Sequence, residues 1–226
     1  MEPNHNYLSV IYSEASHPFN EYPDQLARYL VSRYSISSDQ KLLEVGCGRG
    51  DFLRGFIRAG IQCHGVDQSD IAKKTCPEAE IRLADLEGKI PYEDNFFDVV
   101  YSKSVIEHFY YPDNLFTEIH RVLKPGGLVI SLTPDWEYNY KNFYEDYTHR
   151  VPFTLTSLND IMLITSFENI QIERFRQLPF LWKMPWLKLL TVLTAWMTPS
   201  FMRKNSKFIR FSKEVMLLGS GTKPKA

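Results

Sequence analysis

The chain has 226 residues, a length that suits one domain with additions better than two full domains. Its 44% hydrophobic and 23% charged residues are ordinary for a globular protein, and three cysteines without repeated spacing argue against a disulfide framework and a zinc ribbon. The net charge of −1 conceals an asymmetry, because residues 170–226 hold eleven Lys and Arg against two Glu. This excess predicts that the C-terminal part meets an anionic surface or substrate.

The segment before residue 41 is expected to form an arm followed by one helix. Residues 1–20 show no periodicity, whereas apolar side chains recur at helical spacing over residues 23–34. The first ten residues lack a basic start followed by an apolar run, and no stretch of about 20 apolar residues occurs in the chain. We therefore expect neither a signal peptide nor a spanning helix, and a cytoplasmic location.

Short apolar runs alternate with helical patterns through the middle of the chain. The runs predict strands at residues 41–45, 61–66, 79–83, 96–102 and 128–133. Helices are expected over residues 52–60, briefly before Pro77, and over residues 112–123, where a proline begins the helix. This alternation predicts a doubly wound, mostly parallel sheet with ligands at the carboxyl ends of its strands.

The alternation loosens after residue 133. Residues 134–152 are expected to form a long aromatic and polar loop, and loops of that length tend to be functional. A helix is predicted at 157–164, a strand at 170–174, and a last strand or strand pair at 208–218. We thus expect one domain over residues 1–226: an N-terminal helical arm (1–40), a core (41–133), and an acceptor-side loop with a C-terminal helical and strand extension (134–226).

A glycine-rich segment joins the first predicted strand to the helix after it. It reads Glu-Val-Gly-Cys-Gly-Arg-Gly over residues 44–50, and such glycines let the backbone approach a ligand closely. Dinucleotide-binding loops usually space their glycines as G-x-G-x-x-G. Here the carboxylate of Asp51 would repel a diphosphate, so dinucleotide binding ranks second as an interpretation of this loop. Glu44 instead suits a cationic ligand.

Carboxylates also follow the next two predicted strands. Asp67 ends the second strand, where a carboxylate can accept hydrogen bonds from both hydroxyls of a ribose. Asp85 follows the third strand, where it can read the amino group of an adenine. Together with the glycine loop, these positions predict a site for a nucleoside that carries positive charge.

Five ordered segments, at residues 43–50, 65–67, 84–86, 97–108 and 123–127, resemble the motifs of class I S-adenosylmethionine (SAM)-dependent methyltransferases. The loop is similar to that of small-molecule methyltransferases with an E-x-G-C-G-x-G motif. The resemblance implies a Rossmann-like α/β fold, SAM as cofactor, and structural roles for Asp98 and for Glu107-His108. No bound metal is expected, because the pair Asp146 and His149 is too small a cluster to indicate one. It implies cofactor contacts at Glu44, Gly46, Cys47, Gly48, Gly50, Asp67, Gln68, Asp85, Leu86 and Ser102.

The 134–152 loop holds the candidates for catalysis. Asp146 and His149 are three residues apart, and a carboxylate that orients a histidine makes a reasonable general base or half of a metal site. Residues 146–154 resemble a D-x-T-H-x-x-P-F-T pattern of methyltransferases encoded with glycan and cell-surface polysaccharide pathways. The resemblance implies O-methylation of a saccharide, with His149 as base and Asp146 orienting it. His17 is a second base candidate.

Other readings stay open at this point. Asp146 and His149 can simply brace the loop, and the acceptor can be another small molecule, such as a quinone precursor or a secondary metabolite. A SAM-binding protein without catalysis is a further alternative, although such a protein would not need an intact set of cofactor residues. The oligomeric state is open as well.

Residues 182–213 are apolar in their first half and basic around it. The thirteen residues between Pro185 and Pro199 would span roughly 20 Å as a helix, too short to cross a bilayer. Such a segment can rest on an anionic membrane surface at the inner face of the membrane, cover the pocket as a lid, or form a dimer contact. Contact with a membrane would favour a lipid-linked glycan. A nucleic-acid partner is not expected, because no known binding module is present.

Overall fold

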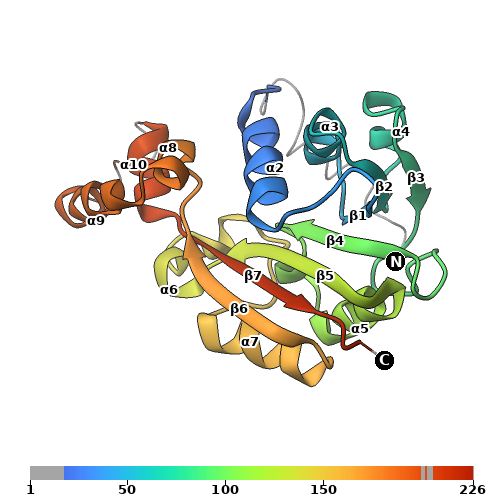
Figure 1. Ribbon diagram of the computed structural model, residues 1–226. Helices are drawn as coiled ribbons and strands as arrows, with labels where there is room; N and C mark the ends of the chain where they lie inside the picture. The colour runs from blue at the N-terminus through green and yellow to red at the C-terminus, as the bar shows by residue number, and fades with distance from the viewer. Residues whose placement is uncertain (1–17, 200–201, 203–205, 226) are drawn as a thin grey trace.

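The computed structural model describes residues 18–199, 202 and 206–225, and it contains one seven-stranded sheet between layers of helices (Figure 1). The strand order is β3-β2-β1-β4-β5-β7-β6, and only β7 runs antiparallel to its neighbours. The predicted doubly wound, mostly parallel α/β fold is therefore confirmed. The strands are β1 (Lys41–Val45), β2 (Gln62–Asp67), β3 (Glu80–Leu83), β4 (Phe97–Lys103), β5 (Leu123–Pro134), β6 (Glu168–Phe175) and β7 (Met216–Thr222).

Helices cover both faces of the sheet, and five of them bury apolar side chains against the strands (Figure 1). One layer holds α2 (Tyr22–Arg33), α3 (Asp51–Arg58) and the short α4 (Ile71–Thr75). The other layer holds α5 (Pro112–Val122) and α7 (Leu155–Ile164). The two apolar cores that result support the carboxyl ends of the parallel strands from both sides.

The start of the fifth strand differs from the prediction. The expected turn at residues 123–127 is instead the first part of β5, which begins directly after α5. Gly126 has a φ of 78°, and the register with β4 shifts between Phe97 and Val99. The glycines thus place an irregularity inside the strand, where a turn between the helix and the strand was expected.

The segment expected as a long loop contains two short helical turns, α6 (Trp136–Asn139) and η2 (Phe143–Glu145). Asp135 is fully buried and caps α6 by accepting a hydrogen bond from the amide of Glu137. Its other carboxylate oxygen lies 2.8 Å from Nε of Arg174 in β6. This ion pair anchors the segment to the far edge of the sheet.

The strand predicted at residues 208–218 is wrong over its first half. Residues Lys207–Lys213 form helix α10, because the Ser206 side chain accepts a hydrogen bond from the amide of Ile209 and caps the first turn. The strand itself is β7, inserted between β5 and β6.

The helices α8 (Pro179–Lys183), η3 (Pro185–Leu187), α9 (Lys188–Met197) and α10 form an arm beside the sheet (Figure 1). We call this group the C-terminal arm. Residues 200–201 and 203–205 of the segment singled out at 182–213 lie outside the described residues. Within the described ranges, none of the helices has the length and apolar character needed to cross a bilayer.

Candidate active site

The loop after β1 depends on three glycines in the left-handed region. The φ angles of Gly46, Gly48 and Gly50 are 72°, 52° and 75°. A Cβ at Gly46 would collide with the side chain of Val105, and one at Gly50 would lie 2.8 Å from Cβ of Cys76. Only glycine therefore fits at these two positions, and the backbone of the loop stays open to a ligand.

Asp67 closes this loop from the end of β2. Its carboxylate accepts hydrogen bonds from the amides of Gly48 and Ser69, both at 2.8 Å. Burial raises the pKa of Asp67, and these two amides act against that rise. Because a carboxylate offers about four acceptor positions, Asp67 can hold the loop and still receive ribose hydroxyls.

Glu44 lies on β1 directly before the loop and is 3% exposed. Burial raises the pKa of its carboxyl well above the usual range, and the nearby carboxylates of Asp51 and Asp67 add to the rise. Its Oε2 has no hydrogen-bond partner within the described part of the chain. A buried carboxyl with one unpartnered oxygen beside an open glycine loop fits the cationic end of SAM.

Gln68 and Asp85 come together at the ends of β2 and β3. The Gln68 amide nitrogen lies 3.4 Å from Oδ1 of Asp85, which also accepts a hydrogen bond from the amide of Glu87 at 3.0 Å. Both Gln68 and Asp85 are exposed to solvent. This position beside the loop suits the predicted adenosine contacts, which remain predictions.

Three other predicted cofactor residues have buried side chains. Cys47 packs beside Gly65, and Leu86 belongs to the apolar core. The hydroxyl of Ser102 lies 3.2 Å from that of Ser131 in the next strand. Any contact of Cys47 with a cofactor therefore comes from its backbone, as expected for a small residue in the loop.

Lys103, the last residue of β4, was not predicted from the sequence as a site residue. Its ammonium lies 5.3 Å from the ring centroid of Phe52, at the start of α3. Burial lowers the pKa of Lys103 to about 8, while Glu107 and Glu44 act to raise it. The available signal was a lysine at the end of a strand that is mostly apolar in its middle, and this lysine places a cation between the loop and the acceptor side.

A cavity of about 610 Å³ opens next to the ends of β4 and β5, between the 134–152 segment and α10. It contains the predicted pair Asp146 and His149 and adds residues from distant parts of the chain. The polar side chains that line it include Lys103, Glu107, Asn142, Asp146, His149 and Arg210.

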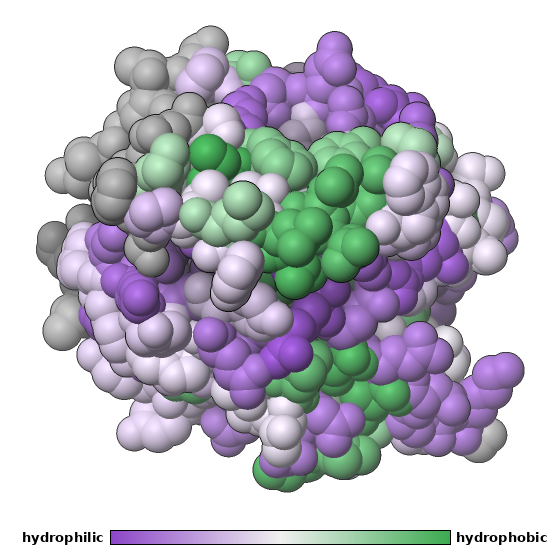
Figure 2. All heavy atoms as spheres, turned by 90° about the vertical axis from the view of Figure 1, so that its left-hand side faces the viewer, coloured by the Kyte–Doolittle hydropathy of each residue, from purple (hydrophilic) through white to green (hydrophobic). Residues whose placement is uncertain are grey.

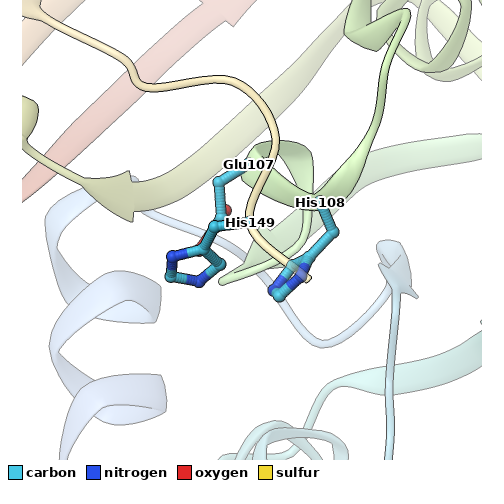
Figure 3. A group of neighbouring side chains, drawn as sticks. All are labelled: Glu107, His108 and His149. Carbon is cyan, nitrogen blue, oxygen red and sulfur yellow. The ribbon is translucent and has the colours of Figure 1, made fainter. Parts of the chain in front are cut away.

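Two of the residues that line this cavity, Glu107 and His149, cluster with His108 (Figure 3). Donor atoms of Glu107, His108 and His149 lie within 4.8 Å of one another, and the two imidazole centroids are 4.7 Å apart. Nδ1 of His149 lies 2.6 Å from the carbonyl oxygen of Phe143. Since a carbonyl only accepts, Nδ1 carries the proton and Nε2 is the basic nitrogen.

The structure does not show the expected orientation of His149 by the Asp146 carboxylate, because Nδ1 of His149 bonds to the carbonyl oxygen of Phe143. The carboxylate of Asp146 instead accepts from the amide and the hydroxyl of Thr148, at 3.0 and 2.6 Å. A carboxylate in a turn commonly bonds to the backbone two residues ahead, which explains this preference. Asp146 acts on His149 through its charge, which opposes the lowering of the His149 pKa by burial.

The remaining expected residues are placed as follows. Asp98 accepts from the amide of Lys41 and pairs with Lys124 at 2.8 Å, at the amino end of β4, which agrees with a structural role. Glu107 is fully buried, and burial raises its pKa to about 7. His17 lies outside the described residues.

Part of the chain matches a known family model. Residues 43–131 match the model of the family described as "Methyltransferase domain". The ubiquinone/menaquinone biosynthesis C-methyltransferase UbiE of Burkholderia mallei is 27% identical over 135 residues, covering 54% of this chain and 55% of that protein. The chain thus spans about half the length of the curated relatives it matches.

Solved structures agree on the fold. Phosphoethanolamine N-methyltransferase 2 of Haemonchus contortus, solved with S-adenosylhomocysteine, superimposes with a TM-score of 0.70 at 19% identity, covering 98% of this chain and 60% of that one. A methyltransferase from Bacillus halodurans, described as putative in its title, gives a TM-score of 0.62 at 17% identity, covering 88% and 99%.

Proposed function

We propose that the chain, whose residues 43–131 match a methyltransferase-domain model, is a SAM-dependent methyltransferase that methylates a hydroxyl of a saccharide or cell-surface glycan intermediate. The observation that carries this proposal is the set of polar side chains that line the cavity at the ends of β4 and β5. An acceptor rich in hydroxyls needs several hydrogen-bonding partners, which charged and amide side chains supply. The D-x-T-H-x-x-P-F-T resemblance of residues 146–154, which border this cavity, points to the same acceptor.

The cofactor supplies a methyl group on a positively charged sulfur. The chain has to hold the acceptor oxygen in line with that methyl carbon and ease the loss of the hydroxyl proton. His149 is the proposed catalytic residue, because its Nε2 makes no hydrogen bond with the described residues and its side chain lines the cavity. Asp146 supports the same cluster through Thr148, whose hydroxyl contacts His108 at 2.8 Å.

A quinone precursor is the second candidate acceptor. It is favoured by the likeness to UbiE and by the exposed tyrosines of the 134–152 segment, among them Tyr140, Tyr144 and Tyr147, which suit a flat ring. The polar cavity lining favours the saccharide.

The proposal is tested in two steps. Calorimetric titration first compares SAM with NADPH, and saturable binding of SAM alone is expected. Radiolabelled SAM is then offered with nucleotide sugars, lipid-linked saccharides and phenolic quinone precursors. Label on a saccharide that is lost in His149→Ala, with SAM binding unchanged, supports the proposal. Label on the phenolic compounds alone would reassign the acceptor.

A further inference from the structure

Glu107 is a buried carboxyl with incomplete hydrogen bonding. It is fully buried in η1 (Ile106–His108), a short helical turn after β4, and its Oε2 accepts from the hydroxyl of Thr133 at 3.0 Å. Its Oε1 is buried and has no hydrogen-bond partner in the described part of the chain. An unpaired buried oxygen is costly, and a cation bound beside it would offset that cost.

Both imidazoles of the cluster are held through the same nitrogen. Nδ1 of His149 donates to the carbonyl of Phe143. The hydroxyl of Thr148 donates to Asp146 at 2.6 Å, so it accepts from Nδ1 of His108 at 2.8 Å. Each ring therefore has Nε2 as its unprotonated nitrogen. Histidines that bind metals show this arrangement, in which the second nitrogen donates to a carbonyl or to a polar group backed by a carboxylate.

We propose that Glu107, His108 and His149 bind one divalent cation at the cavity wall (Figure 3). Two imidazoles and one carboxylate favour Zn²⁺, Mn²⁺ or a similar ion over Mg²⁺, which prefers oxygen ligands. Bonds of about 2.1 Å require donors closer than the present limit of 4.8 Å. The side chains therefore have to move closer together around an ion, and Oε1 of Glu107, which has no hydrogen-bond partner among the described residues, would lose no bond in doing so.

We expect the bound cation to take part in methyl transfer by activating the acceptor hydroxyl. This role rests on the proposed function. A site with three protein ligands keeps a position for the acceptor hydroxyl. Binding there makes the hydroxyl more acidic, and its proton passes to water. The acceptor oxygen then bonds to the methyl carbon as the carbon–sulfur bond breaks, and the electron pair stays on sulfur. His149 is thereby a ligand, in place of the base expected from the sequence.

Cobalt provides a readout that is independent of activity, because Co²⁺ bound by imidazole absorbs visible light. The full chain is freed of metal with EDTA, dialysed, and titrated with CoCl₂. We expect visible absorption that saturates at one equivalent. His149→Ala and Glu107→Gln should each weaken Co²⁺ binding at least about tenfold, in line with the loss of one ligand. His120→Asn, a histidine on α5 outside the cluster, should bind as the wild type does.

The outcomes separate the site from the function. A wild type without saturable absorption, or ligand variants that bind Co²⁺ as tightly as the wild type, would overturn the metal site. Circular dichroism of both variants identifies a loss that comes from unfolding, and either folded variant is sufficient for the test. Intact Co²⁺ binding without methylation of any saccharide would refute the acceptor and leave the site standing. Methylation without metal binding would return His149 to the role of base.

The C-terminal arm carries an independent feature, an exposed apolar surface. Trp186 and Trp196 are 74% and 84% exposed. Figure 2 views the molecule from the side on which the arm lies, and apolar side chains gather on that face. The other large exposed apolar residues of α9 are Leu189, Leu190, Val192, Leu193 and Met197. An exposed apolar patch of this size indicates a surface that binds a protein partner or a membrane.

The charges around this patch indicate its partner. No acidic residue occurs between Arg174 and Glu214, whereas Lys183, Lys188 and Lys207 are exposed. We infer that the arm rests on a bilayer surface that carries anionic lipid. Tryptophan and lysine are typical of such interfacial helices, and α9, with ten residues, is only about 15 Å long. Since α10 lines the cavity, a docked membrane would lie beside the cavity and suit a lipid-linked acceptor.

Vesicle cosedimentation tests this surface. The chain should bind vesicles of phosphatidylcholine with phosphatidylglycerol, and less well those of phosphatidylcholine alone or at high salt. Trp186→Ser/Trp196→Ser should reduce binding at least about tenfold, through the loss of apolar burial. The control is Leu163→Ser/Ile164→Ser, which removes exposed apolar residues from α7. Absence of vesicle binding would overturn the inference, as would a dimer in light scattering that the arm variant dissociates.

Discussion

Asp67 shows how one side chain serves both the fold and the ligand. Because its carboxylate accepts from two loop amides, Asp67→Asn loses one charged acceptor and loosens the glycine loop. We expect SAM affinity to fall about tenfold, corresponding to roughly 1.4 kcal/mol. Calorimetry measures this, with Asp70→Asn as the control, since Asp70 is exposed and its side chain does not cap α4. Equal affinities for both variants would contradict the role of Asp67.

His64 predicts a pH dependence of stability. It is buried against the rings of Tyr92, Phe96 and Phe97, and neither of its ring nitrogens has a hydrogen-bond partner among the described residues. Burial lowers its pKa, while Glu80, 3.4 Å away, acts to raise it. A lowered histidine pKa contributes stability above the unfolded value of 6.5, and this contribution is lost as the pH falls.

The measurement is urea unfolding at about pH 7.5 and about pH 5.5, on either side of that ordinary value. The wild type should lose more free energy of unfolding between the two than His64→Phe, which keeps the ring packing without a titrating group. Other buried groups titrate in the same range, so only the difference between the two proteins reports on His64. Identical losses would refute the assignment.

At the scale of elements, the pair of Arg174 and Asp135 ties β6 to the segment that borders the cavity. Asp135 is fully buried and Arg174 is about a third exposed. Arg174→Met leaves the carboxylate without its cation, and we expect a loss of about 2 kcal/mol, less than for a fully buried pair. Glu173→Gln on the same strand breaks only the exposed pair with Arg33 and should cost under about 1 kcal/mol. Chemical denaturation measures the free energy of unfolding of the two variants. Equal losses in both would show that Asp135 needs no cation.

For the whole molecule, β7 is the strand on which the C-terminal half depends. It lies between β5 and β6 and pairs with both of them. Deletion of residues 215–226 should abolish cooperative unfolding in circular dichroism, because β6 then has no partner strand. Deletion of residues 224–226 should be tolerated, since it keeps Lys223, whose ammonium binds the carbonyls of His120 and Leu123. A cooperative transition in the longer deletion would contradict this view.

Local patterns in the sequence were sufficient to predict much of this protein. The period of apolar residues predicted the strands and helices between residues 41 and 133, and the spacing of Gly46, Gly48 and Gly50 predicted the ligand loop. These features depend on neighbours along the chain: side-chain periodicity, positive φ at glycine, and strand ends that share one edge of a parallel sheet. The prediction of SAM as cofactor and of a methyltransferase rests on the same segment, which the methyltransferase-domain model also matches.

Tertiary structure decided the features that join distant segments. Helix α10 and strand β7 were not separated in the sequence, because the partners of β7 are β5 and β6, far away along the chain. The cluster of Glu107, His108 and His149 joins residues about forty positions apart, and Asp146 bonds to Thr148 in place of His149. A hydrogen bond or metal ligand is chosen by the groups that packing brings within reach, and sequence spacing alone does not contain that information.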